Sequence, residues 1–337
     1  MKTLFKPLLA CLITAGALAA PQALAADIKP RLIRFGYGLA EDSNQGRAVK
    51  MFADEVAKRS GGKLKVKGFG SASLGNDVQM QNALIGGAQE MMVGSTATLV
   101  GVEKDFGVYD LPFLFANEKE ADTVLDGPFG QKLIAKLPAK GLVGLTYWEN
   151  GFRNVTNTKR PITRFEDFQG IKLRVMQNPV YIDMFNSFGA NAVPLAFAEL
   201  FTALETRAVD GQENPVNTIQ SSKFYEVQKY LSVTKHVYSP WVMTASKKWW
   251  DGLSRDEQKI LQDAALASRT FERKDSRAEA MRSVKFLTQQ GMKINMVSDA
   301  ELKRMREKAK PAFDKFAANG GAEVLKELQG ALGQLRK

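Results

Sequence analysis

An arginine stands on a short predicted strand near the middle of the chain. In the stretch GIKLRVMQNP, residues 170–179, the side chains of Ile171, Leu173 and Val175 alternate toward one face, as in a strand with one buried side. Arg174 lies on the opposite face, just before a turn. One interpretation is a solvent-exposed edge, where charged residues oppose aggregation. The other is an anion site, because a guanidinium offers two parallel N–H donors that match a carboxylate.

Two neighbouring segments place further polar groups at similar positions. The segment YWENGFRN brings Trp148 and Arg153 to the end of an apolar strand. In VDGQENP, Pro215 biases the backbone of Asn214 toward an extended conformation. Ligands of open α/β sheets bind beyond the carboxyl ends of the strands. These residues are therefore candidate ligand contacts, although Trp148 also fits a core position and Asn214 a turn position.

Groups that catalysis or cofactor binding would need are scarce. His236 is the only histidine in the sequence, which excludes a histidine metal cluster, and we interpret it as structural. No GxxxxGK[ST] phosphate loop occurs, and the glycines of GFGSASLG lack the dinucleotide fingerprint and favour a turn. We therefore expect no cofactor, no metal and no enzyme. An exported hydrolase with paired carboxylates is the enzyme alternative.

The N-terminal residues 1–26 have the pattern of a secretory signal peptide. Lysines precede an apolar run over 8–20 that is too short to span a membrane, and small residues offer cleavage after Ala25 or Ala26. Cleavage would also remove Cys11, the only cysteine, and with it any disulfide or thiol nucleophile. We predict a periplasmic protein.

The charge of the chain favours small anions over nucleic acid as partners. The formal net charge is +11, of which the predicted signal peptide carries two lysines. The basic residues are scattered among acids, as in KKWWDGLSRDEQK, and no aromatic-rich basic tract occurs. Such a positive field attracts small anions or keeps the protein soluble. A binder of nucleic acid or of anionic surfaces is the interaction alternative.

The elements that must position these residues form two α/β units. The first third alternates predicted strands and helices, in chain order over 31–38, 43–62, 63–69, 77–87 and 88–95. This rhythm predicts parallel strands with crossover helices, and it restarts after Arg153. The last third is predicted to be helical, with capping-box spacing at Ser254 and at Ser298. About 310 residues suffice for two such lobes.

Longer segments resemble a known family. KLRV, FAELFTALETRAVDGQENP and SSKFYEVQKYLSVTKH are similar to the periplasmic solute-binding subunits of tripartite ATP-independent (TRAP) transporters, the DctP family. FGYGLAEDSNQGRAVKMFADEVAKRSGGKLKV and LGND fit the family's N-terminal lobe. The similarity covers essentially the whole chain after the predicted signal peptide. It implies a two-lobed α/β periplasmic binding protein fold, with a ligand cleft between the lobes and long C-terminal helices.

The resemblance also implies a division of the chain and a function. Lobe I is expected from 27–150 plus 239–279, and lobe II from 151–238 plus 280–337 with the C-terminal helices. The protein would capture an organic acid as a monomer and deliver it to the small and large permease subunits of a TRAP transporter. A binding protein that reports to a sensor kinase is a closely related alternative.

The family's pocket can be carried over residue by residue. Arg174 corresponds to the arginine that clamps the substrate carboxylate in most members. Arg153 and Asn214 match a second pocket arginine and the pocket asparagine, and Phe197 matches the phenylalanine of the family's xAFxE motif. These assignments favour the anion-site interpretation of Arg174 over the edge-strand one.

The first-lobe side of the pocket departs from one branch of the family. Sialic-acid-binding members have an asparagine and a glutamate where this chain has Gly38 and Ser95, which argues against sialic acid. Trp148 and Tyr37 are expected as pocket walls. Two arginines favour C4-dicarboxylates such as succinate or malate as ligands, with sugar acids or aromatic acids as alternatives.

Overall fold

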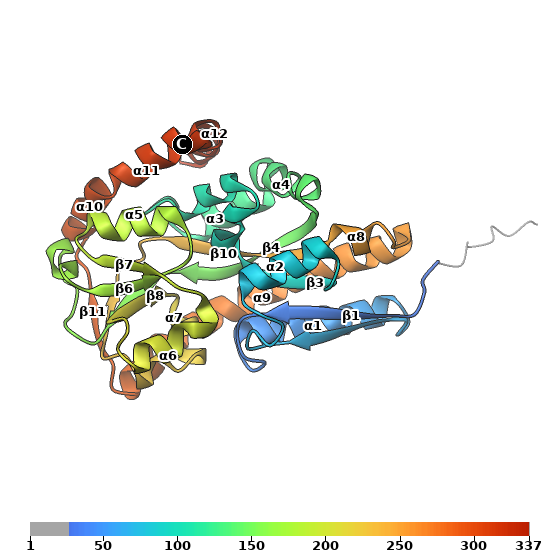
Figure 1. The fold of residues 1–337 in the computed structure, drawn as a ribbon, viewed down its shortest axis with the longest axis horizontal. Coiled ribbons are helices and arrows are strands. Elements are labelled where there is room, and N and C mark those ends of the chain that lie inside the picture. Colours follow the sequence, from blue (N-terminus) through green and yellow to red (C-terminus); the bar gives the residue numbers. More distant parts are fainter. Residues whose placement is uncertain (1–26, 337) are drawn as a thin grey trace, which may run out of the picture.

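Two β-sheets, each flanked by helices, make up the molecule (Figure 1). The computed structural model describes residues 27–336, so the predicted signal peptide lies outside the described residues. The mixed α/β class and the two lobes predicted from the sequence are confirmed. We call the half built on the five-stranded sheet lobe I and the half built on the six-stranded sheet lobe II.

The sheet of lobe I combines parallel and antiparallel strands. Its order is β2 (Leu64–Phe69), β1 (Arg31–Tyr37), β3 (Met91–Ser95), β10 (Tyr238–Ser246) and β4 (Leu142–Phe152). β1 pairs in parallel with β2 and β3, as the sequence rhythm predicts, and the helices α1 (Asn44–Arg59) and α2 (Asp77–Gly86) connect these strands. β10 runs antiparallel to both β3 and β4.

The sheet of lobe II is mixed as well. Its order is β11 (Lys293–Met296), β9 (Tyr230–Val233), β5 (Asn154–Asn157), β8 (Gly211–Asn214), β6 (Lys172–Val175) and β7 (Asn191–Pro194). β6 pairs in parallel with β7 and β8, whereas β5 runs antiparallel to β8 and β9. The chain therefore enters this sheet from β4 through β5 and leaves it from β9 toward β10.

Helices cover both sheets. Those of lobe I include α3 (Glu118–Asp126), α4 (Pro128–Ile134) and α8 (Lys247–Trp250), and those of lobe II include α5 (Pro179–Ser187), α6 (Leu200–Glu205) and α7 (Val216–Ser221). No helix among residues 27–336 combines the length and the apolar character that a membrane span needs.

The prediction of an all-helical last third is wrong at β9, described above, and at two further strands. All nine residues of β10 are buried, so the sequence shows no two-residue alternation there, and Pro240 coincides with a shift in its pairing with β4. β11 is a four-residue edge strand that pairs only through β9. Neither strand carries the periodic signal from which a strand is predicted.

The remaining part of the last third is helical. α9 (Arg255–Gln289) starts with the predicted capping box of Ser254 and Glu257. The later helices are α10 (Asp299–Lys308), α11 (Lys310–Phe316) and α12 (Ala322–Leu335). The Ser298 side chain caps α10 by accepting a hydrogen bond from the Glu301 backbone N–H.

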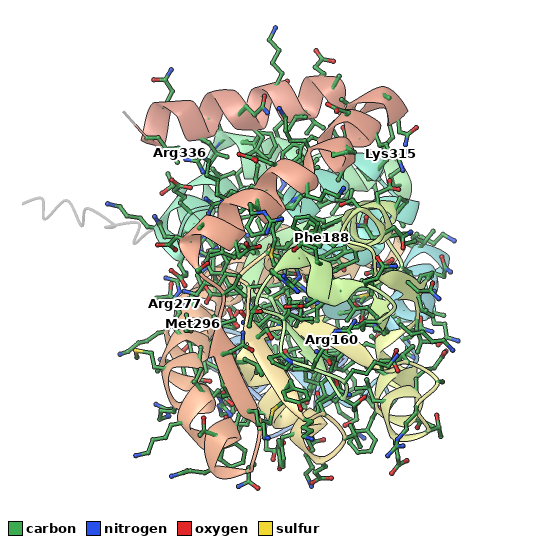
Figure 2. The ribbon with its side chains drawn as sticks, turned by 90° about the vertical axis from the view of Figure 1, so that its left-hand side faces the viewer. Arg160, Phe188, Arg277, Met296, Lys315 and Arg336 are labelled. Atoms are coloured by element: carbon green, nitrogen blue, oxygen red, sulfur yellow. The ribbon has the colours of Figure 1, made fainter. Side chains whose placement is uncertain are left out.

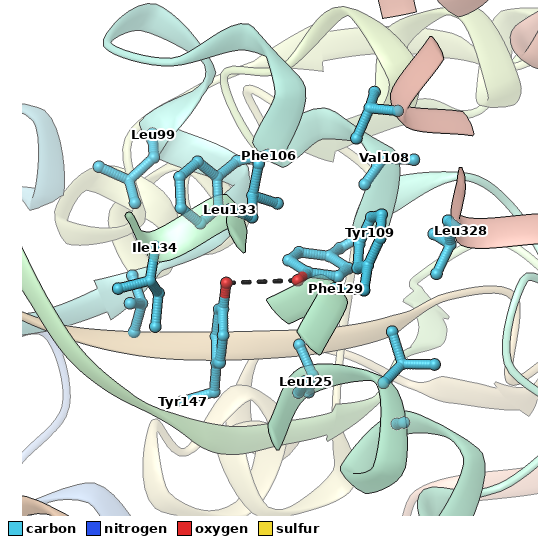
Figure 3. Packing of buried hydrophobic residues seen from close by; sticks show 14 of the residues in the cluster. Leu99, Phe106, Val108, Tyr109, Leu125, Phe129, Leu133, Ile134, Tyr147 and Leu328 are labelled. Carbon is cyan, nitrogen blue, oxygen red and sulfur yellow. Dashed lines mark hydrogen bonds between the residues drawn. The ribbon is translucent and has the colours of Figure 1, made fainter. Parts of the chain in front are cut away.

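Long helices join the lobes. The first half of α9 packs on lobe I through Leu261 and Ala264, and its last turns pack on lobe II through Leu287. Figure 2 shows the C-terminal helices running across one face of the molecule, with Lys315 near the end of α11 and Arg336 at the end of α12. The core of lobe I reaches these helices, and within it Tyr147 points toward Tyr109, with 3.3 Å between the hydroxyl oxygens (Figure 3).

Candidate ligand-binding site

A cavity lies between the two lobes, with about 590 Å³ of empty space when the open solvent at its mouth is included. Residues that follow strands or begin helices line it on both sides, as expected for α/β sheets. Lobe I contributes Gly38, Leu39, Gln45, Asn76, Asp77, Gly94, Ser95 and Thr98. Lobe II contributes Arg174, Met176, Gln177, Leu195, Ala196, Phe197, Asn214 and Thr218, and the segments that connect the lobes contribute Asn150, Arg153 and Trp241.

Arg174 presents an unused part of its guanidinium at this cavity. It lies on β6 and is only 2% exposed. Its Nε donates to the Leu195 carbonyl oxygen at 2.9 Å, while its buried Nη1 has no hydrogen-bond partner among the described residues. Burial lowers the pKa of Arg174 to about 10, against the charge of Glu213. The side chain is thus still a cation at neutral pH, and its Nη1 lacks a hydrogen-bond acceptor.

Arg153 follows β4 and is fully buried, but most of its donors are used. Its Nη2 donates to Glu213 Oε1 at 2.8 Å and to Asn214 Oδ1 at 3.1 Å, and its Nε pairs with the same carboxylate. Although burial acts to raise the pKa of Glu213, the charge of Arg153 holds it below its ordinary value. Only Nη1 of Arg153 is buried without a partner. The charges of Arg153 and Glu213 therefore nearly cancel each other.

His236 contacts the carboxylate of this pair on the side away from the cavity. Its Nε2 lies 3.0 Å from Glu213 Oε2, and its Nδ1 lies 2.8 Å from the Thr234 hydroxyl oxygen. Burial lowers the pKa of His236. The histidine does not line the cavity, and its contacts fit the structural interpretation.

Asn214 and Phe197 complete the lobe II side. Asn214 ends β8, and its amide Nδ2 donates to Gln212 Oε1 at 2.6 Å. Phe197 begins the short 3-10 helix that follows β7. A Cβ atom added at Gly38 would lie 3.9 Å from the Phe197 ring. The lobes thus approach closely at this glycine.

On the lobe I side, Ser95 stands at the end of β3. Its backbone N–H donates to Asp77 Oδ2 at 3.0 Å, and its hydroxyl oxygen accepts from the Ala97 backbone N–H at 3.2 Å. The cavity therefore brings together five of the seven residues named from the sequence, which are Ser95, Arg153, Arg174, Phe197 and Asn214.

Tyr37 and Trp148 do not line the cavity. Both are buried in the hydrophobic cluster of lobe I that contains Trp241. Tyr37 packs against Gly70, where an added Cβ would lie 2.9 Å from its ring. The neighbouring Gly38 and the cross-strand partner Trp241 line the cavity instead. A role of these two aromatic residues as pocket walls stays a prediction.

Asp77 is the main cavity residue that the sequence did not single out. It is partly buried at the start of α2, and its carboxylate stands between two glycines. A Cβ at Gly38 would lie 3.8 Å from Oδ1, and one at Gly94 would lie 3.0 Å from Oδ2. Burial raises the pKa of Asp77, against the Ser95 N–H and the charge of Arg174. The signal was an acid at a helix start beside a strand end, within the LGND segment.

The arrangement suits an acid that also carries hydroxyl groups. One wall offers unpaired N–H donors to a carboxylate, and the other offers a carboxylate and the amides of Gln45, Asn76 and Asn150. Within residues 27–336 there is no group of three or more acidic, histidine or cysteine side chains placed to hold a metal ion.

Comparisons with known proteins agree with this geometry. The family described as "Bacterial extracellular solute-binding protein, family 7" (DctP) matches residues 35–319. The sugar acid binding protein DctPAm from Advenella mimigardefordensis, solved in complex with galactonate, has 54% sequence identity and a TM-score of 0.90 to this chain. The match covers 91% of this chain and 99% of that one.

Two further relatives have names that specify different ligands. The 2,3-diketo-L-gulonate-binding periplasmic protein YiaO of Escherichia coli is 41% identical over 242 residues, which are 72% of this chain and 74% of that protein. The C4-dicarboxylate-binding periplasmic protein DctP of Rhodobacter capsulatus is 30% identical over 331 residues, which are 97% of this chain and 99% of that protein.

Proposed function

The chain belongs to the DctP family of TRAP transporter solute-binding proteins, and from this premise we propose that its ligand is a sugar acid. The carboxylate of the ligand binds the free donors of Arg174, and its hydroxyls donate to Asp77 across the cavity. The observation that carries this proposal is that two complementary groups line the same cavity. Arg174 has an Nη1 without a partner, and the facing wall has the carboxylate of Asp77.

The same observation ranks the ligand classes. The second carboxylate of a C4-dicarboxylate needs a second free cation, but Arg153 already pairs with Glu213. It would also meet the like charge of Asp77, which is unfavourable at short range. A ligand hydroxyl needs no second cation, and the charge of Asp77 does not repel it. Two of the three proteins compared above have names that specify a sugar acid, which supports this order.

The magnitudes are adequate for a transport protein. A hydrogen bond to a charged group contributes about 1.5–3 kcal/mol. Two such bonds from Arg174 and two from hydroxyls to Asp77 would contribute about 6–12 kcal/mol before the cost of association, and a micromolar Kd corresponds to about 8 kcal/mol net.

The remaining assignments follow from the family. Its members bind small carboxylates, act with TRAP membrane subunits and are binding proteins, and the relatives are periplasmic. The proposal for this chain is a monomer that is not an enzyme, reaches the periplasm after cleavage of residues 1–26, and delivers its ligand to the small and large permease subunits.

The test compares galactonate, succinate and galactose by calorimetry with wild type and with Asp77→Asn. Wild type should bind galactonate more tightly than succinate and should not bind galactose. Asp77→Asn removes the negative charge but keeps the shape, so the preference for galactonate over succinate should fall about tenfold, or 1.4 kcal/mol. Binding of succinate alone, or of galactose alone, would refute the sugar-acid assignment.

A further inference from the structure

A second cavity adjoins the ligand-binding cavity on the side of the C-terminal helices. Its empty space is about 1190 Å³, against about 590 Å³ for the first. It lies between α2, the 3-10 helix Thr96–Gly101, the start of α5 and the junction of α11 with α12. Thr98 and Gln177 line both cavities, so these two residues form a shared wall.

The two halves of this wall differ in how firmly they are held. The Thr98 hydroxyl donates to the Ser95 carbonyl oxygen at 2.8 Å and accepts from Gln81 Nε2 at 2.8 Å, so its place on lobe I is fixed. Gln177 faces it from lobe II and is exposed. The Gln177 side chain forms no hydrogen bond or ion pair with any other part of residues 27–336. It is the half of the wall that no hydrogen bond or ion pair holds.

Two charged side chains line the outer cavity, but both already have partners: Lys104 contacts the Asn319 carbonyl oxygen, and Asp183 pairs with Lys315. The rest of the lining suits a hydroxyl-rich group. Its polar lining includes the amides of Gln81, Asn82 and Asn319, which both donate and accept. Apolar surface comes from Val78 and Phe316. Sugar rings need this mixture of amide partners and apolar contact.

We propose that Thr98 and Gln177 set the length of acid that the protein accepts, and that the outer cavity can hold a further sugar unit once Gln177 is removed. The inference rests on the proposed function, since it takes the ligand carboxylate to lie at Arg174. An acid that is short enough to fit between Arg174 and the wall binds to the wild-type protein. A glycosylated sugar acid extends past the wall and is excluded by the Gln177 side chain.

The experiment measures Kd by calorimetry for gluconate and for lactobionate, which is gluconate bearing a galactose unit. The variants are Gln177→Ala and Gln177→Ser, with Gln329→Ala as the control because Gln329 is an exposed glutamine of α12 that lines neither cavity. In wild type, lactobionate should bind at least about 100-fold more weakly than gluconate. Each Gln177 variant should narrow this ratio at least about tenfold, or 1.4 kcal/mol, and Gln329→Ala should keep the wild-type ratio.

Two results would overturn the inference. Equal affinity of wild type for both acids would mean that no wall limits length. An unchanged ratio in both Gln177 variants, with melting temperatures like that of wild type, would mean that Gln177 does not form it. If wild type binds neither acid, the proposed function itself fails, which the gluconate titration alone reveals.

Discussion

At the residue scale, the buried guanidinium of Arg174 is the least satisfied group of the cleft. A buried donor without an acceptor costs about 1–3 kcal/mol, and more when it is charged. Arg153, by contrast, donates hydrogen bonds to Glu213 and Asn214 within the protein. The two arginines therefore differ in role although both line the cavity. A ligand carboxylate would supply the acceptor that Arg174 lacks.

Replacing Arg174 by lysine tests this difference. Arg174→Lys keeps the charge but loses the paired donors, so affinity for the acid should fall at least about tenfold, or 1.4 kcal/mol. Calorimetry at neutral pH measures the change. Arg164→Lys is the control, because Arg164 is an exposed arginine of lobe II, with 65% of its side chain accessible. Equal affinity of wild type and a folded Arg174→Lys variant would return Arg174 to the edge-strand interpretation.

The site residues that the sequence predicts best are those without an ordinary local explanation. Arg174 and Arg153 are charged groups beside apolar strands, so their types raised the possibility of a site, and the family resemblance then favoured it. Asp77 escaped notice because an acid in the first turn of a helix is already explained by the helix dipole. Tyr37 was named as a wall next to Gly38 because strand side chains alternate, and only the pairing of β1 fixes which face meets the cleft.

At the element scale, the local signals predict strands and helices, but not the direction of the strands that connect the lobes. β1, β2 and β3 follow the βαβ rhythm and are parallel. β5 and β10 run antiparallel to their neighbours because the chain passes from one sheet to the other at these points. That pairing depends on contacts far apart in the chain, which a local pattern does not contain.

A buried acid joins α9 to the strand β4. Glu272 Oε2 accepts the Glu149 backbone N–H at 2.7 Å, and its Oε1 accepts the Ser276 hydroxyl at 2.5 Å. Burial raises the pKa of Glu272 to about 8, against the hydrogen bond from Ser276. In the unfolded chain the same group would titrate near 4.5.

The raised pKa makes this contact sensitive to pH. Between about pH 4.5 and 8 the folded state binds more protons at Glu272 than the unfolded state does, so stability falls as pH rises through this window. The loss is at most about 1.4 kcal/mol per pH unit. Glu272→Gln removes the ionisation, so its melting temperature should fall less than that of wild type between pH 5 and pH 8. Glu205→Gln, at an exposed position, should behave like wild type; an equal fall in all three proteins would contradict the pKa shift.

At the scale of the whole molecule, the C-terminal helices tie the two lobes together. α11 is fixed to lobe II by an ion pair between Lys315 and Asp183 at 2.6 Å. α12 is fixed to lobe I by buried side chains such as Leu328 and by an ion pair between Arg336 and Glu120 at 2.8 Å. The helix path breaks between them, over Ala317–Gly321.

Two glycines of this segment should respond to alanine in opposite directions. Gly320 has φ +89°, and a Cβ there would meet the Lys104 ammonium group. Gly320→Ala should therefore destabilise the protein by roughly 1–2 kcal/mol. Gly330 lies inside α12 with open space around it, so Gly330→Ala should stabilise the protein by up to about 1 kcal/mol. Denaturant unfolding measures both values, and a stabilising Gly320→Ala would show that the break does not need a glycine.

At this scale we also expect the two lobes to move relative to each other on binding. The division predicted from the sequence, 27–150 plus 239–279 and 151–238 plus 280–337, stays a prediction. The two lobes built on the two sheets meet at the cleft, and the cavity needs residues of both. An acid held by Arg174 gains its contacts to Asp77 only when the lobes are together. We therefore expect ligand to select the closed arrangement by this difference in contacts.

Distances between spin labels on the two lobes test this selection. Residues 27–337 contain no cysteine, so Lys50→Cys on α1 and Glu205→Cys on α6 would carry the only labels (Figure 1). Both positions are exposed and stand on different lobes. Galactonate should shorten the mean distance and narrow its distribution, and Asp77→Asn should weaken this response because the closed state loses part of its advantage. A distance that stays the same while galactonate binds tightly would mean that the lobes are rigid and that ligand enters a preformed site.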